Sequence, residues 1–128
     1  METSCYINGV WVPTREHFPV SDPATGKIVG HAADAPPELA TAAITSAHNA
    51  FQGWAGSTAR DRAEGIRRIS RALLEEIDQT ADLIVSEQGK PRGQALFEVR
   101  YATEWLEWFA EEARRAYGEI IPSPGSSK

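Results

Sequence analysis

The last third of the sequence carries apolar side chains on more than one face of a single long helix. Helical spacing predicts this helix over residues 94–117. Three aromatic residues, Tyr101, Trp105 and Trp108, lie away from its main apolar seam. A helix at the surface of a domain usually buries one stripe, so this helix must be covered on a second side. The predicted seam consists of Ala95, Val99, Ala102, Leu106, Phe109 and Ala113.

Three further helices are predicted ahead of the long one. The first begins at Pro36-Pro37, because proline is well tolerated in an opening turn, and it ends at Gly56. The third begins at Asp78 and stops at Gly89, a residue type that commonly ends helices. The apolar stripe of the first helix is expected to contain Ala40, Ala43, Ile44, Ala47 and Phe51.

The helix between these two follows Thr58, whose hydroxyl oxygen can accept from the free backbone N–H groups of the first turn. We expect Glu64 to pair with Arg68 one turn later. The buried face of this helix is predicted to consist of Ile66, Ile69, Leu73 and Ile77.

The first part of the chain is predicted to form short strands joined by turns, over about residues 6–32. Asn8-Gly9 separates two short apolar runs, and both residue types tolerate the positive φ that a two-residue hairpin turn needs. Asp22-Pro23 and Thr25-Gly26 mark a second turn, and an alternating strand follows over 27–32. Strands this short need another layer to pack against. The predicted fold class is therefore mostly α, with short N-terminal β-hairpin strands.

Charge and cysteine content exclude several classes of function. The chain of 128 residues has a net charge of -5 with acidic and basic residues interleaved, which argues against nucleic acid and anionic membranes as partners. No apolar run is long enough to predict a membrane span. The single cysteine, Cys5, cannot form an internal disulfide and suits a reducing compartment. We expect a cytoplasmic protein.

Five short segments follow one another in a distinctive order. Glu-Gln-Gly-Lys-Pro at 87–91 is followed by Trp-Phe-Ala-Glu-Glu at 108–112 and Tyr-Gly-Glu-Ile-Ile-Pro at 117–122. Tyr-Ile-Asn-Gly at 6–9 and Ser-Asp-Pro-Ala-Thr-Gly-Lys at 21–27 precede them. Together they resemble the beginning of an NAD(P)-dependent aldehyde dehydrogenase, and the last two look most like the succinate-semialdehyde dehydrogenase branch.

The resemblance implies a fold that this chain would form only in part. Residues 1–128 would be the N-terminal part of the coenzyme-binding domain of an α/β aldehyde dehydrogenase, without its nucleotide-binding parallel sheet. Within it, about 6–32 would be strands and turns, about 36–118 helices, and 119–128 an extended tail.

The resemblance also implies a reaction and a cofactor. In the family a cysteine thiolate attacks the aldehyde, an asparagine and a backbone N–H hold the oxyanion, hydride passes to NAD or NADP, and a glutamate activates water. No residue of this chain matches the nucleophile, the general base or the nucleotide contacts. We therefore assign no catalytic and no cofactor-binding residue, and we expect no cofactor to bind this chain alone.

Two kinds of site residue follow from the resemblance. Glu87 matches a position whose carboxylate, in some relatives, joins the backbone carbonyls near Val20 and Ser21 around a monovalent cation, and oxygen ligands suit hard cations. The alternative is a solvated carboxylate near a helix end. Tyr101 matches a position that lines the substrate tunnel for the aldehyde, and its alternative is plain packing of an amphipathic aromatic ring.

Other reactive residues do not form a site in the sequence. Cys5 precedes the first hairpin, at the wrong end of the chain for the family nucleophile, and is interpreted as an incidental thiol. His17, His31 and His48 lack the close partners that a metal site needs. No predicted strand leads into a glycine-rich phosphate loop.

Two functional hypotheses follow. In the first, the chain is a truncated family member, related to enzymes that oxidise an aldehyde such as succinate semialdehyde to the acid through a cysteine thiohemiacetal, and it is inactive alone. In the second, it is a helical interaction module that docks on intact family subunits or on another partner. Apolar surface expected around Trp105, Trp108 and Phe109 motivates the second hypothesis.

Overall fold

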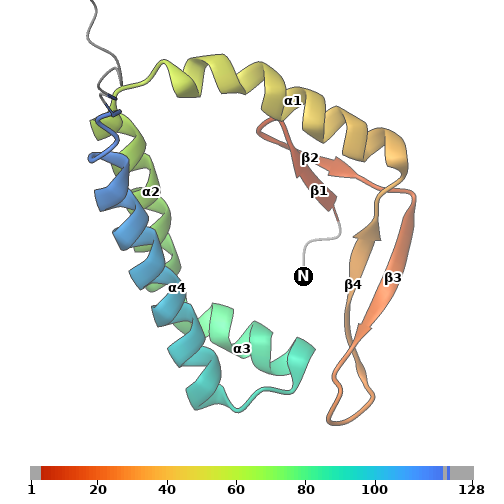
Figure 1. Ribbon diagram of the computed structural model, residues 1–128. Coiled ribbons are helices and arrows are strands. Elements are labelled where there is room, and N and C mark those ends of the chain that lie inside the picture. Colours follow the sequence, from red (N-terminus) through yellow and green to blue (C-terminus); the bar gives the residue numbers. More distant parts are fainter. Residues whose placement is uncertain (1–3, 120, 122–128) are drawn as a thin grey trace, which may run out of the picture.

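The computed structural model describes residues 4–119 and 121, which form two β-hairpins followed by four helices (Figure 1). This confirms the predicted class, mostly helical with N-terminal hairpin strands. The expected tail at 119–128 lies outside the described residues except for Glu119 and Ile121. The strands are β1 (Ser4–Ile7), β2 (Val10–Pro13), β3 (Glu16–Ser21) and β4 (Ile28–Asp34), and the helices are α1 (Pro37–Ala55), α2 (Ala59–Glu75), α3 (Ile77–Gln88) and α4 (Arg92–Ala113).

Each hairpin is a separate two-stranded antiparallel sheet, β1 with β2 and β3 with β4. The predicted turn at Asn8 and Gly9 is confirmed, because both residues have positive φ, 52° and 80°. Ser46 of α1 donates from Oγ to Asn8 Oδ1 over 3.2 Å and so ties this turn to the first helix. In Figure 1, α1 runs from the hairpins to the α2 and α4 pair.

The helix ends follow the capping chemistry of the sequence. Thr58 accepts from the backbone N–H of Asp61 over 3.1 Å, which confirms it as the N-cap of α2. Gly89 is the C-cap of α3 in the left-handed conformation, as predicted. The bounds of α4, predicted as roughly 94–117, differ from the observed ones by two residues at the start and four at the end. The helix begins directly after Pro91 and ends at Ala113, where the N–H of Arg114 donates to the carbonyl of Glu111 and the N–H of Arg115 donates to the carbonyl of Glu112.

The core lies where α2 and α4 pack side by side in opposite directions (Figure 1). Ser70 donates from Oγ to the carbonyl of Thr103 over 3.4 Å. Ala63 lies seven residues before Ser70 and Ala110 lies seven residues after Thr103, and both are fully buried. Small side chains at these positions let the two backbones approach closely. The buried residues are Ala63, Ser70, Ala81, Ala95, Val99, Thr103 and Ala110.

Several large side chains predicted for the core are exposed instead. Phe109 of the predicted α4 seam, Ile69 of α2, and Ile44 and Phe51 of α1 all face solvent, and so does the small Ala102. Ala95 and Val99 of the predicted α4 seam are buried as expected, but the other buried residues are alanine, serine and threonine, so the core excludes the largest apolar side chains.

The predicted pairing of Glu64 with Arg68 is also wrong. Glu64 binds Arg71, with Oε1 and Nη2 2.5 Å apart.

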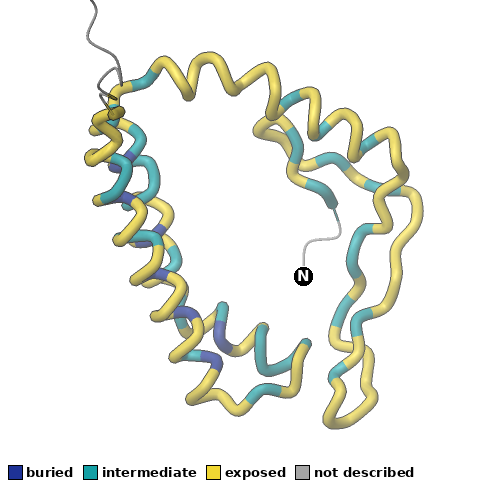
Figure 2. The backbone as a smooth tube through the Cα atoms, viewed as in Figure 1, coloured by how far each residue is buried: buried dark blue, intermediate teal, exposed yellow. Residues whose placement is uncertain are grey.

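The described chain exposes far more surface than a compact protein of its size. Its accessible surface is 9927 Å², whereas a compact monomer of 14.0 kDa exposes about 6,700 Å². The eleven residues outside the description could account for at most about 1,600 Å² of the difference, even as unfolded chain. Figure 2 shows buried positions only on α2, α3 and α4 among the described residues. Much of the apolar surface is therefore exposed to solvent in the described chain.

Candidate functional site

The segments that carry the predicted cation ligands approach each other where the end of α3 lies near the β3–β4 hairpin. Val20 and Ser21 are the last residues of β3, and Glu87 is half-buried in the last turn of α3. Gly89, just after that turn, lies so close to the hairpin that an added Cβ would be 2.9 Å from Cγ of Pro23. The fold thus brings the end of α3 near the β3–β4 hairpin, although Ser21 and Glu87 are 66 positions apart in sequence.

The strand pairing is irregular at the predicted carbonyl ligands. Val20 pairs with Gly30 and Ser21 pairs with Ile28, so Val29 is passed over. Such a bulge interrupts the regular ladder of hydrogen bonds and turns backbone groups out of it. Sequence analysis missed the bulge, because nothing in the local pattern marks the partner of each strand residue.

A hydrogen-bonded turn follows these two residues directly. Asp22 Oδ1 accepts from the N–H of Ala24 over 2.8 Å, and Asp22 Oδ2 accepts from the hydroxyl of Thr25 over 2.8 Å. The N–H of Gly26 donates to the carbonyl of Asp22 over 2.7 Å. The Thr25 hydroxyl, and then the Ala24 N–H, hold the pKa of Asp22 below its ordinary value of 3.8. The turn is therefore organised around an ionised carboxylate.

The hydrogen bonds of this turn predict that the melting temperatures of the protein and of an Asp22→Asn variant differ by an amount that depends on pH. A lowered pKa stabilises the fold above the unfolded-state pKa, and this contribution is lost as pH falls through the folded-state value. We expect the variant to melt at a lower temperature at pH 6, and the difference to narrow below about pH 4. Thermal melts at several pH values check this, with Asp34→Asn as an exposed control. A difference that stays constant with pH would contradict it.

Ion pairs connect α3 to the start of α4. Arg92 Nε is 2.7 Å from Asp82 Oδ1, and Arg92 Nη2 is 2.6 Å from Asp78 Oδ1. Hydrogen bonds to Asp82 first, and then to Asp78, raise the pKa of Arg92. Lys90 pairs with Glu98. Exposed pairs contribute little free energy, but these fix the angle of the α3–α4 corner beside Gly89.

Tyr101 lies apart from this region, in a row of exposed rings on α4. The ring centroids of Phe97 and Tyr101 are 6.0 Å apart, and those of Tyr101 and Trp105 and of Trp105 and Phe109 are each 5.9 Å apart. With Trp108 these residues form what we call the aromatic face, and each is between 46% and 67% exposed. Tyr101, Trp105 and Trp108 line a shallow hollow together with Glu104. Sequence analysis missed Phe97, although its position four residues before Tyr101 was a usable signal.

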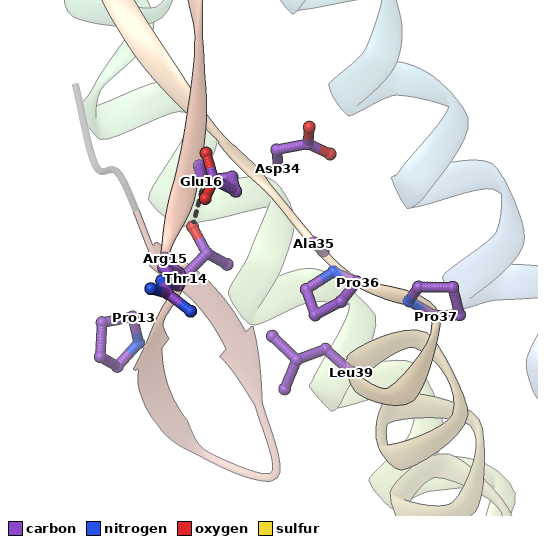
Figure 3. A pocket seen from close by; sticks show the side chains of 9 residues that line it. All are labelled: Pro13, Thr14, Arg15, Glu16, Asp34, Ala35, Pro36, Pro37 and Leu39. Carbon is purple, nitrogen blue, oxygen red and sulfur yellow. Dashed lines mark hydrogen bonds between the residues drawn. The ribbon is translucent and has the colours of Figure 1, made fainter.

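A second hollow lies between the hairpins and the start of α1 (Figure 3). The Thr14 hydroxyl donates to the carbonyl of Glu16 over 2.9 Å at its edge. None of the predicted site residues lines it. Its lining is Pro13, Thr14, Arg15, Glu16, Asp34, Ala35, Pro36, Pro37 and Leu39.

The remaining reactive residues do not gather into a centre. Cys5 is half-exposed in β1, opposite Val12. Among the described residues, no group of three or more histidine, cysteine, aspartate or glutamate side chains could hold a metal ion. No helix within the described part of the chain is long and apolar enough to cross a membrane.

The chain is similar in sequence to known enzymes along nearly its whole length. The chain is 38% identical to mitochondrial succinate-semialdehyde dehydrogenase of Homo sapiens over 128 residues, which are 100% of this chain and 24% of that protein. It is 40% identical to the NADP(+) succinate-semialdehyde dehydrogenase of Saccharomyces cerevisiae over 119 residues, covering 92% of this chain and 24% of the relative. The chain thus spans about a quarter of the length of the curated relatives it matches.

A solved structure supports the same relationship. The succinate-semialdehyde dehydrogenase of Burkholderia pseudomallei superposes with a TM-score of 0.91 at 35% identity, covering 98% of this chain and 26% of that one. The match is to the N-terminal part of that fold, as the resemblance implied. The model of the aldehyde dehydrogenase family matches residues 11–128. The chain belongs to the aldehyde dehydrogenase family.

Proposed function

We propose that these residues serve as the N-terminal part of an NAD(P)-dependent aldehyde dehydrogenase subunit that oxidises succinate semialdehyde or a similar aldehyde to its acid. The observation that carries the proposal is the match along the whole chain, in sequence and in fold, to succinate-semialdehyde dehydrogenases. The net reaction consumes the aldehyde, water and oxidised nicotinamide, and gives the acid, the reduced nicotinamide and a proton.

Residues 1–128 contribute structure to this reaction and none of its bond-making groups. No glycine-rich phosphate loop is found among the described residues, so we expect other parts of a complete subunit to hold the nicotinamide cofactor. The proposed cofactor of the complete subunit is NAD or NADP. The cytoplasmic location stays a prediction.

Two positions in this segment are proposed to serve the complete subunit. Tyr101 would line the tunnel for the aldehyde, and its position in the exposed aromatic face supports this. Glu87 would hold a monovalent cation with the carbonyls of Val20 and Ser21. A carboxylate and two carbonyl oxygens are the donor set that a hard cation prefers, and the bulge and the approach of α3 to β3 favour this grouping.

A chimeric enzyme tests the proposal. Residues 1–128 replace the matching part of the Burkholderia pseudomallei enzyme, and formation of reduced nicotinamide from succinate semialdehyde is measured. We expect turnover within about tenfold of the parent, because the fold is shared over nearly the whole segment. As a matched control, the chimera with Val99→Asp, which places a charge in the core, should be inactive. A soluble, folded chimera without activity would contradict the proposal.

A second candidate function is an interaction module that docks on intact family subunits. The exposed aromatic face favours it, because contiguous apolar patches of this kind mark interaction sites. The purified chain mixed with the intact Burkholderia pseudomallei enzyme should co-elute in size-exclusion chromatography if this candidate is right. Separate elution at micromolar concentrations would exclude docking on that enzyme.

A further inference from the structure

We propose that Gly89 is a positioning residue for the cation site, together with Pro23. The left-handed backbone of Gly89 and its contact with Pro23 would set the end of α3 against the β3–β4 hairpin beside its bulge, and so place Glu87 near the carbonyls of Val20 and Ser21. The inference rests on the proposed function, and specifically on its cation-binding part. Gly89 and Pro23 would supply no ligand atom, but they would determine how close Glu87 lies to the two carbonyls.

The backbone of Gly89 closes α3 in a way that other residues resist. Its φ is 67°, and its N–H donates to the carbonyl of Val85 over 2.9 Å. Only glycine adopts this region without steric cost. The helix therefore ends at Gln88, one residue after Glu87, and the chain turns immediately toward Lys90 and α4.

The missing side chain of Gly89 also permits the close approach itself. A Cβ at this position would lie 2.9 Å from Cγ and 3.8 Å from Cδ of Pro23. The pyrrolidine ring of proline is closed on its own backbone and cannot rotate away as a flexible side chain would. Any larger residue must therefore push α3 and the hairpin apart.

The hairpin side of this contact is held firmly. Pro23 sits inside the turn that Asp22 organises through Ala24 and Thr25. The bulge at Val20 and Ser21 comes directly before that turn. A displacement at Pro23 is therefore transmitted to the two carbonyls over only two residues.

Ion pairs that do not involve Glu87 connect α3, α4 and the loop between them, so the Glu87 carboxylate can serve as a cation ligand. Arg92 binds Asp78 and Asp82 on α3, and Lys90 binds Glu98 on α4. Within the described residues Glu87 forms no ion pair. The position of the Glu87 carboxylate therefore depends on Gly89 and Arg92, at the two ends of the α3–α4 connection, because no ion pair within the described residues holds it.

Hydrogen exchange measured on the 128-residue chain tests the proposal locally. Exchange is followed by mass spectrometry in potassium chloride and in tetramethylammonium chloride at equal concentration, because the larger cation cannot be coordinated. We expect potassium to slow exchange about threefold to tenfold in peptides containing residues 18–25 and 84–91. The Glu87→Gln variant should lose this protection.

Four variants separate a positioning role of Gly89 from a general effect on stability. Gly89→Ala should lose the potassium effect, whereas Gly93→Ala should keep it, because a Cβ at Gly93 meets nothing within 4 Å. Pro23→Ala, which removes the contact without straining φ, should weaken the effect, and it replaces Gly89→Ala if that variant does not fold. Adding Pro23→Ala to Gly89→Ala should restore part of the effect.

The outcomes distinguish the positioning role from the site itself. If Glu87→Gln loses the potassium effect while Gly89→Ala and Pro23→Ala retain it in full, the site stands and the positioning role is wrong. If the unaltered chain shows no potassium effect, the cation site fails, and the positioning role fails with it. Neither result bears on the chimera, which tests family activity separately.

Discussion

Replacing Ala110 with leucine is expected to lower the free energy of unfolding by about 2–3 kcal/mol, because the new side chain would separate α2 from α4. Ala110 is fully buried, and the register set by Ser70 and Thr103 places it opposite Ala63. Ala110 has no exposed surface, so the added carbons must displace a helix. For a chain with so small a core, this loss is a large part of its stability. Urea unfolding followed by circular dichroism measures it.

The matched control is Ala102→Leu, on the exposed side of the same helix. It adds the same atoms and the same helix propensity without meeting α2, so its free energy of unfolding should change by less than about 0.5 kcal/mol. Equal effects of the two substitutions would show that α2 and α4 are not packed through their small residues.

Glutamine at Trp105, Trp108 and Phe109 together is expected to remove most of the binding of a fluorescent dye that reports exposed apolar surface. These rings are about half exposed, so each leaves about 2–3 kcal/mol of burial free energy unrealised. Glutamine is a good helix former, and α4 should keep its helicity. We expect dye fluorescence to fall at least about fivefold and aggregation to diminish.

A glutamine at a buried position is expected to have the opposite effect on dye binding. Val99→Gln disrupts the core, so it should lower helicity and increase dye binding. If the triple variant binds as much dye as the unaltered chain, the aromatic face is already covered, by a second copy or by a rearranged helix. That result would remove the main support for docking through this face.

Local chemistry predicted the ends of the elements better than their packing. Asn8-Gly9, Thr58 and Gly89 each act within a few residues, so the turn, the cap and the helix stop were readable from sequence and are confirmed. The predicted apolar seams are confirmed at Ala95 and Val99, which are buried, but they are wrong at large residues such as Phe109 and Ile69, which are exposed. In the structure the helices meet through alanine, serine and threonine, and the large side chains face outward.

The candidate site could be predicted only in part. Glu87, Val20 and Ser21 were assigned through the family resemblance, and the fold brings their segments together. The bulge, the contact of Gly89 with Pro23 and the pairing of Arg92 with Asp78 and Asp82 depend on which distant segments meet. No local pattern encodes these partners. The cation itself and the tunnel role of Tyr101 remain predictions.

The most direct measurement is the turnover of rigorously purified 128-residue chain with succinate semialdehyde and either NAD+ or NADP+. The reactive thiolate, the general base and the nucleotide site are proposed to lie in polypeptide that residues 1–128 do not contain. We therefore expect no reduced nicotinamide above the enzyme-free blank. Steady, aldehyde-dependent formation of NADH or NADPH that scales with the concentration of the chain would contradict this.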